Sequence, residues 1–547
     1  MPEPRRGLAL VPPAALVILA AALRFWALDY GLPHPLTRPD EEVILSPTLY
    51  FARGDLNPHY HIYPGLYLYL VWLWGEAGLA LRRLVVATPP YPAVLLRDLQ
   101  GLPGGTSGQL ILIGRVLTAL AGTATVALVH RLARREGRAV AAAAAALLAT
   151  SYLHVRDSHA LKPDVLLGLA VLPALAACAR VARAPTAGAG ALAGTATGIA
   201  TGMKHPGLLL LAPLYAAGVL GSPAHGWRRC VPGRAVAVGA AVAAALFLAT
   251  SPFLVLDAGS FLRQWAPAGL AVFGSRPGAP SRAFAYHVSV SLRYGTGLLF
   301  TLLAAPAVLL AVAGREPLWR LAGIFAVTWY VVVGASPVHH VRYLTPLLPV
   351  LALLVAVLLG RLAAMAGPRR APLVLALLTA AIVWEPLRAA MAHDAILSRT
   401  DTRVLASRWL AEHARPGDTV AILGTKIWPY GAPVMPPGVQ GESLPPEARA
   451  LGKATWVLTH DHPLEFSRVD PVQLAALLPR LHPEAEFSPF AGDGSAGWFE
   501  KADAYYVPFH DFAGVVRPGP LIRIYSVRDA EMRTGASADA STPGTSR

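Results

Sequence analysis

LALVPPAALVILAAALRFWALDYGLPHPLTRPDEE, residues 8–42, joins an apolar run to an acidic motif. A helix that crosses a bilayer needs about 20 mostly apolar residues, and the run over 8–28 has that length. Arg5 and Arg6 precede the run, and the alanines near its end are typical of a signal-peptide cleavage site. We predict an uncleaved membrane span instead, because the acidic motif that follows it carries the strongest sign of chemistry in the chain.

The rest of the composition agrees with a membrane protein. Hydrophobic residues make up 54% of the 547 residues and charged residues only 14%, whereas a soluble domain has about 25% charged residues. The sequence predicts a polytopic all-α membrane protein with about 11–12 transmembrane helices. The candidate spans lie near residues 8–28, 109–133, 138–154, 164–182, 187–203, 206–221, 235–251, 295–314, 318–334, 344–362 and 371–388.

The net charge of +15 follows from the topology and does not point to nucleic acid. Residues 1–388 hold 32 Lys and Arg against 14 Asp and Glu, while residues 389–547 hold 15 against 18. In the membrane part the arginines gather in one set of loops, which the positive-inside rule makes cytoplasmic. We therefore predict a multi-pass protein of the plasma (inner) membrane with a cytoplasmic N-terminus. Most acids then face outward.

Three domains are expected. Residues 1–388 form the transmembrane catalytic domain, and within it 29–108 form a first outer loop that carries juxtamembrane helices. We interpret the aromatic segment 63–86 as a helix in the outer interface. An additional transmembrane span over 63–86 is the alternative. Residues 389–532 form a small extracytoplasmic α/β domain, and 533–547 form a disordered tail. In the α/β domain we expect a helix over 401–413 and strands over 419–423, 454–459 and 521–527. The two cysteines, Cys178 and Cys230, exclude a disulfide framework.

The first candidate site is Asp40 and Glu41, which lie in Arg38-Pro39-Asp40-Glu41-Glu42. Adjacent carboxylates beside a membrane can accept a proton from a hydroxyl group and orient it. An acidic cap at a helix start explains the same residues without any chemistry.

Two further candidates interrupt apolar sequence. Asp164 lies where a helix re-enters the membrane, and ionisable groups at that depth are costly unless they are paired or functional. Lys162 or Arg156 is a structural partner for it in the alternative interpretation. Lys204, next to His205 and a proline, is a point charge suited to gripping phosphate, and helix-end packing of a partly hydrated lysine is the alternative.

A last polar group lies at the outward mouth of a span. His339, His340, Arg342 and Tyr343 follow one another closely there and make a candidate phosphate clamp. A zinc site at the adjacent histidines is a weaker interpretation, because neighbouring residues on a helix point about 100° apart.

The order of these features resembles glycosyltransferase family 39. The acidic motif is followed by Gly54-Asp55-Leu56-Asn57-Pro58-His59 and Tyr63-Pro64-Gly65-Leu66-Tyr67, then by Lys204-His205-Pro206-Gly207-Leu208-Leu209 and Arg342-Tyr343-Leu344-Thr345-Pro346-Leu347-Leu348-Pro349. The family is related to the dolichyl-phosphate-mannose protein mannosyltransferases and more distantly to lipid A aminoarabinose transferase. The resemblance covers most of residues 10–360 and implies a GT-C fold with an outward-facing catalytic cavity.

The resemblance also implies a function and roles for residues. The expected activity is inverting transfer of a sugar, a hexosyl or pentosyl group, from a polyprenyl-phosphate carrier to a protein, lipid or glycan acceptor. Asp40 would be the general base, with Glu41 positioning a substrate; Glu42 leaves the choice of carboxylate open. The remaining implied residues are Asp164 as second acid, Lys204, Arg342 and His340 as ligands of the carrier phosphate, and Lys162, His205 and Tyr63 as substrate contacts.

No cofactor is expected, although a divalent metal ion stays open. A transporter or flippase for a lipid-linked or small anionic substrate is the alternative function. Transporters place ionisable groups near the midplane and often contain internal repeats, whereas here those groups gather at one face. A third interpretation makes the membrane part a mere anchor for the α/β domain.

Overall fold

The computed structural model describes residues 12–101, 108–273, 282–424, 428–445, 451–464, 467–492, 497–501 and 505–528. Arg5, Arg6 and the expected tail over 533–547 lie outside these residues. The chain divides into two compact units. Unit 1 comprises residues 1–28, 43–92 and 110–392, and unit 2 comprises residues 29–42, 93–109 and 393–547.

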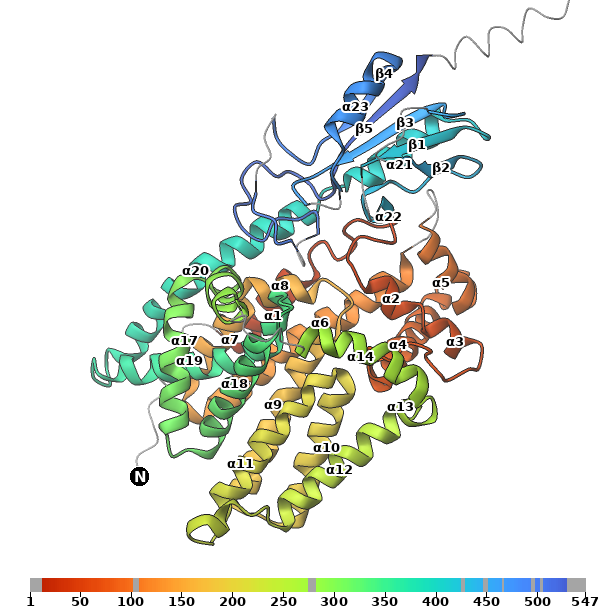
Figure 1. The fold of residues 1–547 in the computed structure, drawn as a ribbon. Helices are drawn as coiled ribbons and strands as arrows, with labels where there is room; N and C mark the ends of the chain where they lie inside the picture. The colour runs from red at the N-terminus through yellow and green to blue at the C-terminus, as the bar shows by residue number, and fades with distance from the viewer. Residues whose placement is uncertain are drawn as a thin grey trace, which may run out of the picture. The chain divides into compact units, whose positions relative to one another are not determined.

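Unit 1 is helical, and every candidate span predicted from the sequence coincides with a helix or a pair of short helices (Figure 1). The corresponding helices are α1 (Pro13–Phe25), α6 (Gln109–Ala133), α7 (Arg138–Ala149) with α8 (Tyr152–Ser158), α9 (Pro163–Arg183), α10 (Ala187–Met203), α11 (Leu211–Gly221), α12 (Arg234–Thr250), α17 (Leu298–Ala313), α18 (Pro317–Ala335), α19 (Leu348–Ala364) and α20 (Ala371–Leu397).

Not all of these helices are long enough to cross a bilayer unbroken. Within the described residues, six helices have the length and apolar character of a span, and two bent pairs raise the number to eight. α7 and α8 are bent by 59° at Ser151, and α16 (Arg293–Thr296) and α17 by 120° at Gly297. Gly297 has a φ of 87°, a left-handed conformation that glycine adopts readily. α1 and the segment over 205–221 are shorter apolar helices.

The tight packing of α10 on α12 shows why these short spans are rich in glycine and alanine. A Cβ on Gly190 would lie 2.0 Å from the carbonyl oxygen of Ala235, and one on Gly194 would lie 2.2 Å from that of Gly239. Small residues four apart let two helix backbones approach closely, which is how helices associate in lipid.

α4 (Gly65–Arg83) is the aromatic segment expected in the outer interface. It is not among the described helices that have the length and apolar character of a span. Leu73 and Leu81 are more than half exposed, although Tyr67 is fully buried. Nearby in sequence lie α2 (Glu41–Leu45), α3 (Thr48–Ala52) and α5 (Tyr91–Gln100).

Unit 2 is an α/β unit built on a five-stranded sheet of order β2-β1-β3-β5-β4. β1 is parallel to both β2 and β3, whereas β5 is antiparallel to β3 and β4. The expected helix and strands are all present, and β3 lies two residues later than expected. The elements are α21 (Thr402–His413), β1 (Thr419–Leu423), α22 (Trp428–Gly431), β2 (Gln440–Ser443), β3 (Trp456–Asp461), α23 (Pro471–Leu477), β4 (Leu481–Phe487) and β5 (Leu521–Val527).

Both faces of this sheet are covered. On one face Ala406 and Leu410 of α21 pack on Val420 and Ile422, while on the other Leu477 of α23 packs in a cluster with Ala421 and Leu423. Alternate residues of β1 thus enter two separate cores, as expected for a strand of a parallel sheet that is buried on both sides.

The observed division of the chain differs from the predicted domains at the first outer loop. Residues 29–42 belong to unit 2, and buried side chains bond them to residues 403 and 432 of the same unit. His34 donates from Nε2 to the carbonyl oxygen of Ala432 over 2.9 Å, and Arg403 donates to that of Leu36 over 3.1 Å. The hydropathy of the sequence alone does not show to which unit a loop belongs.

Candidate active site

Asp164 and Lys204 form a close ion pair within unit 1. The Nζ atom of Lys204 lies 2.6 Å from Oδ1 of Asp164, whose side chain is only 3% exposed, whereas that of Lys204 is 19% exposed. Asp164 lies in the first turn of α9, where a negative charge suits the helix dipole. Lys204 is extended and ends α10, just before the proline-containing η2 (His205–Leu210). A buried carboxylate and a partly hydrated ammonium are thus held at two helix ends.

This pairing differs from the partners considered for Asp164 in the sequence. Arg156 bonds instead to Asp157, with Nη1 and Oδ1 3.0 Å apart. Lys162 is buried and occupies the position just before the first residue of α9. Asp157 also accepts a short hydrogen bond from Thr345, which ties α8 to η5 (Val341–Leu347).

Tyr343 connects the ion pair to the predicted phosphate clamp. The Nζ atom of Lys204 lies 5.6 Å from the centre of the Tyr343 ring, within range of a cation–π interaction. The ring of His340 lies 5.1 Å from that of Tyr343, and Trp329 donates to the Tyr343 carbonyl oxygen over 2.8 Å. Arg342 is half-buried in the same turn of η5.

We call Asp164, Lys204, His340, Arg342 and Tyr343 the Lys204 cluster. These five residues come from three separate stretches of sequence, so spacing could not place them together, although each had been selected as a candidate. The cluster contains two cationic residues, Lys204 and the neighbour of Tyr343 in sequence, Arg342, and cations at a break between helices are suited to holding a phosphate group.

Two other candidates lie in unit 1 beside aromatic rings. His205 contacts the rings of Phe247 and Trp265, each with centroids 6.0 Å apart. Tyr63 packs between the rings of Tyr60 and Tyr67. Tyr63 also lines a small pocket, whose wall comprises Pro58, His61, Tyr63, Gly65, Tyr69, Ser251, Phe253 and Leu254.

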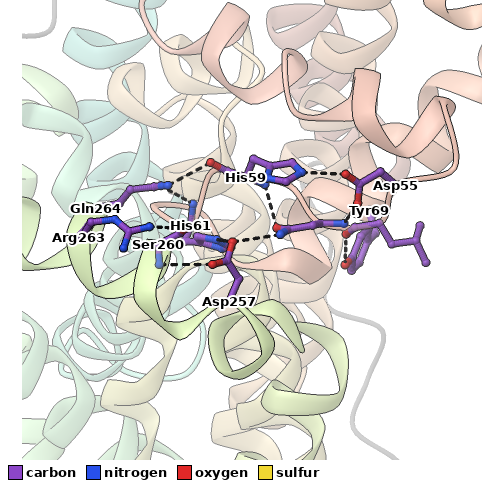
Figure 2. Close-up of polar contacts among 10 residues, drawn as sticks. Asp55, His59, His61, Tyr69, Asp257, Ser260, Arg263 and Gln264 are labelled. Carbon is purple, nitrogen blue, oxygen red and sulfur yellow. Dashed lines mark hydrogen bonds and ion pairs between the residues drawn. The ribbon is translucent and has the colours of Figure 1, made fainter.

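A polar network joins this part of the first outer loop to the segment after α12 (Figure 2). Gln264 of α14 (Ala258–Phe273) accepts from the backbone N–H of His61 over 2.8 Å and donates to the carbonyl oxygen of His59 over 3.0 Å. Asp257 accepts from Asn57 over 3.1 Å and lies 3.5 Å from Nε2 of His61. The segment after α12 is therefore fastened, through Asp257 and Gln264, to the loop over 55–61.

Hydrogen bonds, first that from Asn57, lower the pKa of Asp257 to about 2, so this carboxylate is charged at neutral pH. The pair of hydrogen bonds made by Gln264 is the more specific fastening, because one amide side chain satisfies a donor and an acceptor of the loop backbone.

Replacing Gln264 by alanine is expected to loosen the loop. Two lost hydrogen bonds of about 1 kcal/mol each predict roughly 10- to 30-fold faster amide exchange over residues 57–63. Hydrogen–deuterium exchange of the purified full-length protein measures this. Arg263→Ala is the matched control, because Arg263 bonds to Ser260 of its own helix. Equal exchange in the two variants would show that Gln264 does not hold the loop.

We define the acidic motif as Asp40, Glu41 and Glu42, and all three residues belong to unit 2. α2 begins at Glu41 and continues past the motif to Leu45. Asp40 has a φ of 74°, a left-handed conformation that Asp tolerates better than most residues. Glu41 is fully buried and begins α2. Tyr430 of α22 donates from its hydroxyl to Oε1 of Glu42 over 2.7 Å.

Burial raises the pKa of the Glu42 carboxyl, and the charges of Asp40 and Glu41 add to the rise, while the hydrogen bond from Tyr430 opposes it. Neighbouring carboxylates in different surroundings divide acid and base roles between them. Glu42 thus keeps its proton to higher pH than an ordinary glutamate.

Sequence reasoning missed Tyr430 and Arg403 entirely, whereas Tyr343 already stood in the candidate phosphate clamp. Tyr430 and Arg403 lie about 390 and 365 residues beyond the acidic motif, and no local pattern marks them.

Three buried histidines make unit 2 sensitive to acid. Burial, followed by the charge of Arg403, lowers the pKa of His34, His460 and His462 to about 3 each. Below about pH 6.5 these histidines bind a proton in the unfolded state but stay neutral in the folded state. The free energy of unfolding is therefore highest above that pH and falls as the pH drops toward 3.

Acidification from pH 7 to pH 5 is therefore expected to destabilise unit 2 by on the order of 2 kcal/mol per histidine. Amide exchange over β1 and β3, corrected for the intrinsic effect of pH, reports this loss in the full chain. His482→Gln, an exposed histidine on β4, should leave the pH dependence unchanged, whereas His34→Gln should weaken it. Identical protection at the two pH values would contradict the assignment.

The fold defines the class of the molecule as a membrane protein with the GT-C fold. Two structures of ArnT from Cupriavidus metallidurans superpose with a TM-score of 0.51 each. The one bound to undecaprenyl phosphate is 15% identical, with 93% of this chain and 97% of that chain covered; the apo form is 16% identical, with 94% and 98% covered. The fold inferred from the sequence is thereby confirmed.

Comparison with protein families adds a sequence relationship. Residues 101–255 match the model of the dolichyl-phosphate-mannose-protein mannosyltransferase family, which confirms the resemblance drawn from the motifs. No curated protein sequence matches the chain. The chain is thus related to glycosyltransferases with the GT-C fold, and it is a multi-pass membrane protein.

Proposed function

We propose that the protein is an inverting glycosyltransferase that moves a sugar from a polyprenyl-phosphate carrier to an acceptor on the outer side of the membrane. The observation that carries the proposal is the Lys204 cluster, in which a partly exposed ammonium, 2.6 Å from a buried carboxylate, shares a tyrosine ring with His340 beside Arg342. Preorganised positive charge is what a departing phosphate requires, and Lys204 is held in place by its ion pair with Asp164.

The proposed reaction breaks the bond between the anomeric carbon and the phosphate oxygen. The electron pair stays on that oxygen, so the leaving group is polyprenyl phosphate, an anion that Lys204 and Arg342 stabilise. The acceptor oxygen forms the new bond from the opposite face, and Asp40 takes its proton. Charge develops on the sugar as in other glycosyl transfers, so the transition state has oxocarbenium character.

The other expected residues take supporting roles in the proposal. Glu41 orients a substrate, Asp164 holds Lys204 in place, and Lys162, His205, His340 and Tyr63 contact the carrier or the sugar. Because the two protein cations supply the positive charge at the leaving phosphate, the proposed mechanism uses no cofactor. The donor is lipid-linked, and the acceptor is a protein, lipid or glycan outside the membrane.

The proposed topology follows from the arginine-rich loops. The proposed protein lies in the plasma membrane with its N-terminus in the cytoplasm and its α/β unit outside. The acidic motif is then on the outer side, where we expect lipid-linked sugars to serve as donors.

Mass spectrometry of cell-envelope glycans and glycolipids tests this function in the cell. Cells with the protein should carry a sugar on a protein, lipid or glycan that deletion cells lack, and expression of the full-length chain should restore it. Expression of Asp40→Asn should not restore it. An unchanged envelope in deletion cells would contradict the proposed function. Accumulation of an intact lipid-linked sugar on the cytoplasmic side of the membrane in deletion cells would favour the transporter alternative.

A further inference from the structure

The acidic motif is fastened to the carboxyl-terminal edge of the parallel strands of the α/β unit. β1 ends at Leu423 and β3 ends at Asp461, and the loops that follow them carry Tyr430 and Ser467. In open α/β sheets this edge is where ligands bind. Here the chain's own residues 34–42 bond to the loops at this edge.

Arg403 is the centre of the fastening. Its Nε and Nη2 atoms bond to the two carboxylate oxygens of Asp401 over 2.9 and 2.6 Å, which fixes the plane of the guanidinium. Nη1 then donates to the carbonyl oxygens of Leu36 over 3.1 Å and Tyr430 over 2.8 Å. One fully buried arginine therefore joins the residues before the acidic motif to the helix that carries Tyr430.

The backbone of Leu36 is held from two sides. Its carbonyl oxygen accepts from Arg403, and its N–H donates to Nδ1 of His34 over 3.2 Å. Nε2 of His34 donates in turn to the carbonyl oxygen of Ala432. This pattern requires neutral His34 with its proton on Nε2, in agreement with a pKa that burial lowers to about 3.

A second contact reaches the acidic motif itself. Tyr430 donates from its hydroxyl to Glu42, while its carbonyl oxygen accepts from Arg403, so both ends of the residue are fixed. The ring of Tyr505 packs at 5.1 Å against the ring of Tyr430. Tyr505 and Tyr506 both have positive φ, 42° and 61°, a strained conformation that persists where the surroundings impose it.

Buried groups of the sheet support this arrangement from the other side. The guanidinium of Arg403 lies 4.9 Å from the centre of the Tyr506 ring, and the Tyr506 hydroxyl bonds to Ser467 over 2.5 Å. Ser467 also bonds to His460 over 3.0 Å. A Cβ on Gly431 would lie 2.1 Å from the His460 ring, so the loop of Tyr430 fits here only with glycine.

We propose that Arg403 and Tyr430 are positioning residues for the acidic motif: the α/β unit holds the loop before Asp40 through Arg403 and the carboxylate after it through Tyr430. This inference rests on the proposed function, because it takes Asp40 as the base. The α/β unit is then a working part of the transferase and not an appended module. Misplacing a base by about 1 Å costs roughly 100-fold in rate, so small losses of fastening should be visible.

Two conservative variants test the proposal in the purified full-length protein. Arg403→Lys keeps the charge but cannot bond to Asp401 bidentately and still reach Leu36 and Tyr430. Tyr430→Phe removes only the hydroxyl on Glu42. The matched controls are Arg523→Lys, in an exposed ion pair with Glu486 on the sheet, and Tyr525→Phe on β5.

The first measurement is amide exchange over residues 34–45. Exchange should be faster by roughly tenfold in Arg403→Lys and less so in Tyr430→Phe, with the strands unchanged, and neither control should change it. Normal exchange over 34–45 in both variants would overturn the proposal, whatever the activity of the protein.

The second measurement is release of polyprenyl phosphate from a polyprenyl-phosphate sugar. We expect kcat to fall roughly 10- to 100-fold in Arg403→Lys with little change in KM for the donor. In Tyr430→Phe we expect a smaller fall in kcat, because only the bond to Glu42 is lost, again with little change in KM for the donor.

The outcomes separate this inference from the proposed function. If the wild-type protein releases no polyprenyl phosphate but exchange over 34–45 rises in the variants, the fastening stands and the function falls. If the wild-type protein is active and both variants match it in kcat, the positioning role is wrong and the function stands.

Discussion

Replacing Lys204 by methionine should lower the release of polyprenyl phosphate by roughly 100- to 1,000-fold, a loss typical of removing one preorganised charge from a transition state. Methionine matches the length of the side chain but cannot neutralise the leaving phosphate. The change also strands the buried carboxylate of Asp164, and breaking a buried ion pair costs about 3–5 kcal/mol of stability. Activity and the thermal unfolding midpoint of the purified protein report the two losses separately.

The double variant Asp164→Asn with Lys204→Met distinguishes phosphate binding from structural pairing. With both charges gone, no uncompensated ion is buried, so the unfolding midpoint should return toward that of the wild-type protein. Activity should stay low, because no cation remains at this position. A double variant that regains both stability and activity would make the pair purely structural.

Substituting Asp40 by asparagine should abolish transfer, with a loss of about 100- to 10,000-fold expected for a missing general base. Asparagine is nearly the same shape, and it tolerates the left-handed conformation of this position as well as aspartate does. The fold and the affinity for the donor should therefore be retained. Steady-state kinetics of the purified variant should show the fall in kcat with KM for the donor little changed.

Glu42→Gln is the matched control for the choice of carboxylate. Oε1 of Glu42 already accepts a hydrogen bond from the Tyr430 hydroxyl, so this carboxylate is less available to take a proton from the acceptor. We expect this variant to lose roughly tenfold or less. If Asp40→Asn keeps full activity while Glu42→Gln loses it, Glu42 is the base and the assignment to Asp40 is wrong.

Local features of the fold were predictable because they depend on short-range physics. Apolar length alone located the spans, down to α9 and α10, and alternation with turn residues located β1 and β5. The bends at Ser151 and Gly297 were not predicted, since the apolar run continues across each break. Hydropathy reports burial in the membrane and not the backbone dihedral angles that break a helix.

The site was predictable as a set of residues but not as a set of contacts. Breaks in apolar sequence selected Lys204 and Asp164 separately, but their pairing depends on how α9 and α10 pack. The bond between Tyr430 and Glu42 joins residues 388 apart in sequence. Such contacts arise from tertiary packing, which no local pattern encodes.

Cleavage of a defined donor shows whether the protein is a transferase. Full-length protein in proteoliposomes is given polyprenyl-phosphate sugar labelled in both the sugar and the lipid, with an envelope extract as the source of acceptor. We expect labelled polyprenyl phosphate to be released in step with the appearance of label on the acceptor, and Asp40→Asn to stop both. Movement of the doubly labelled donor across the membrane with no cleavage would contradict the proposed function.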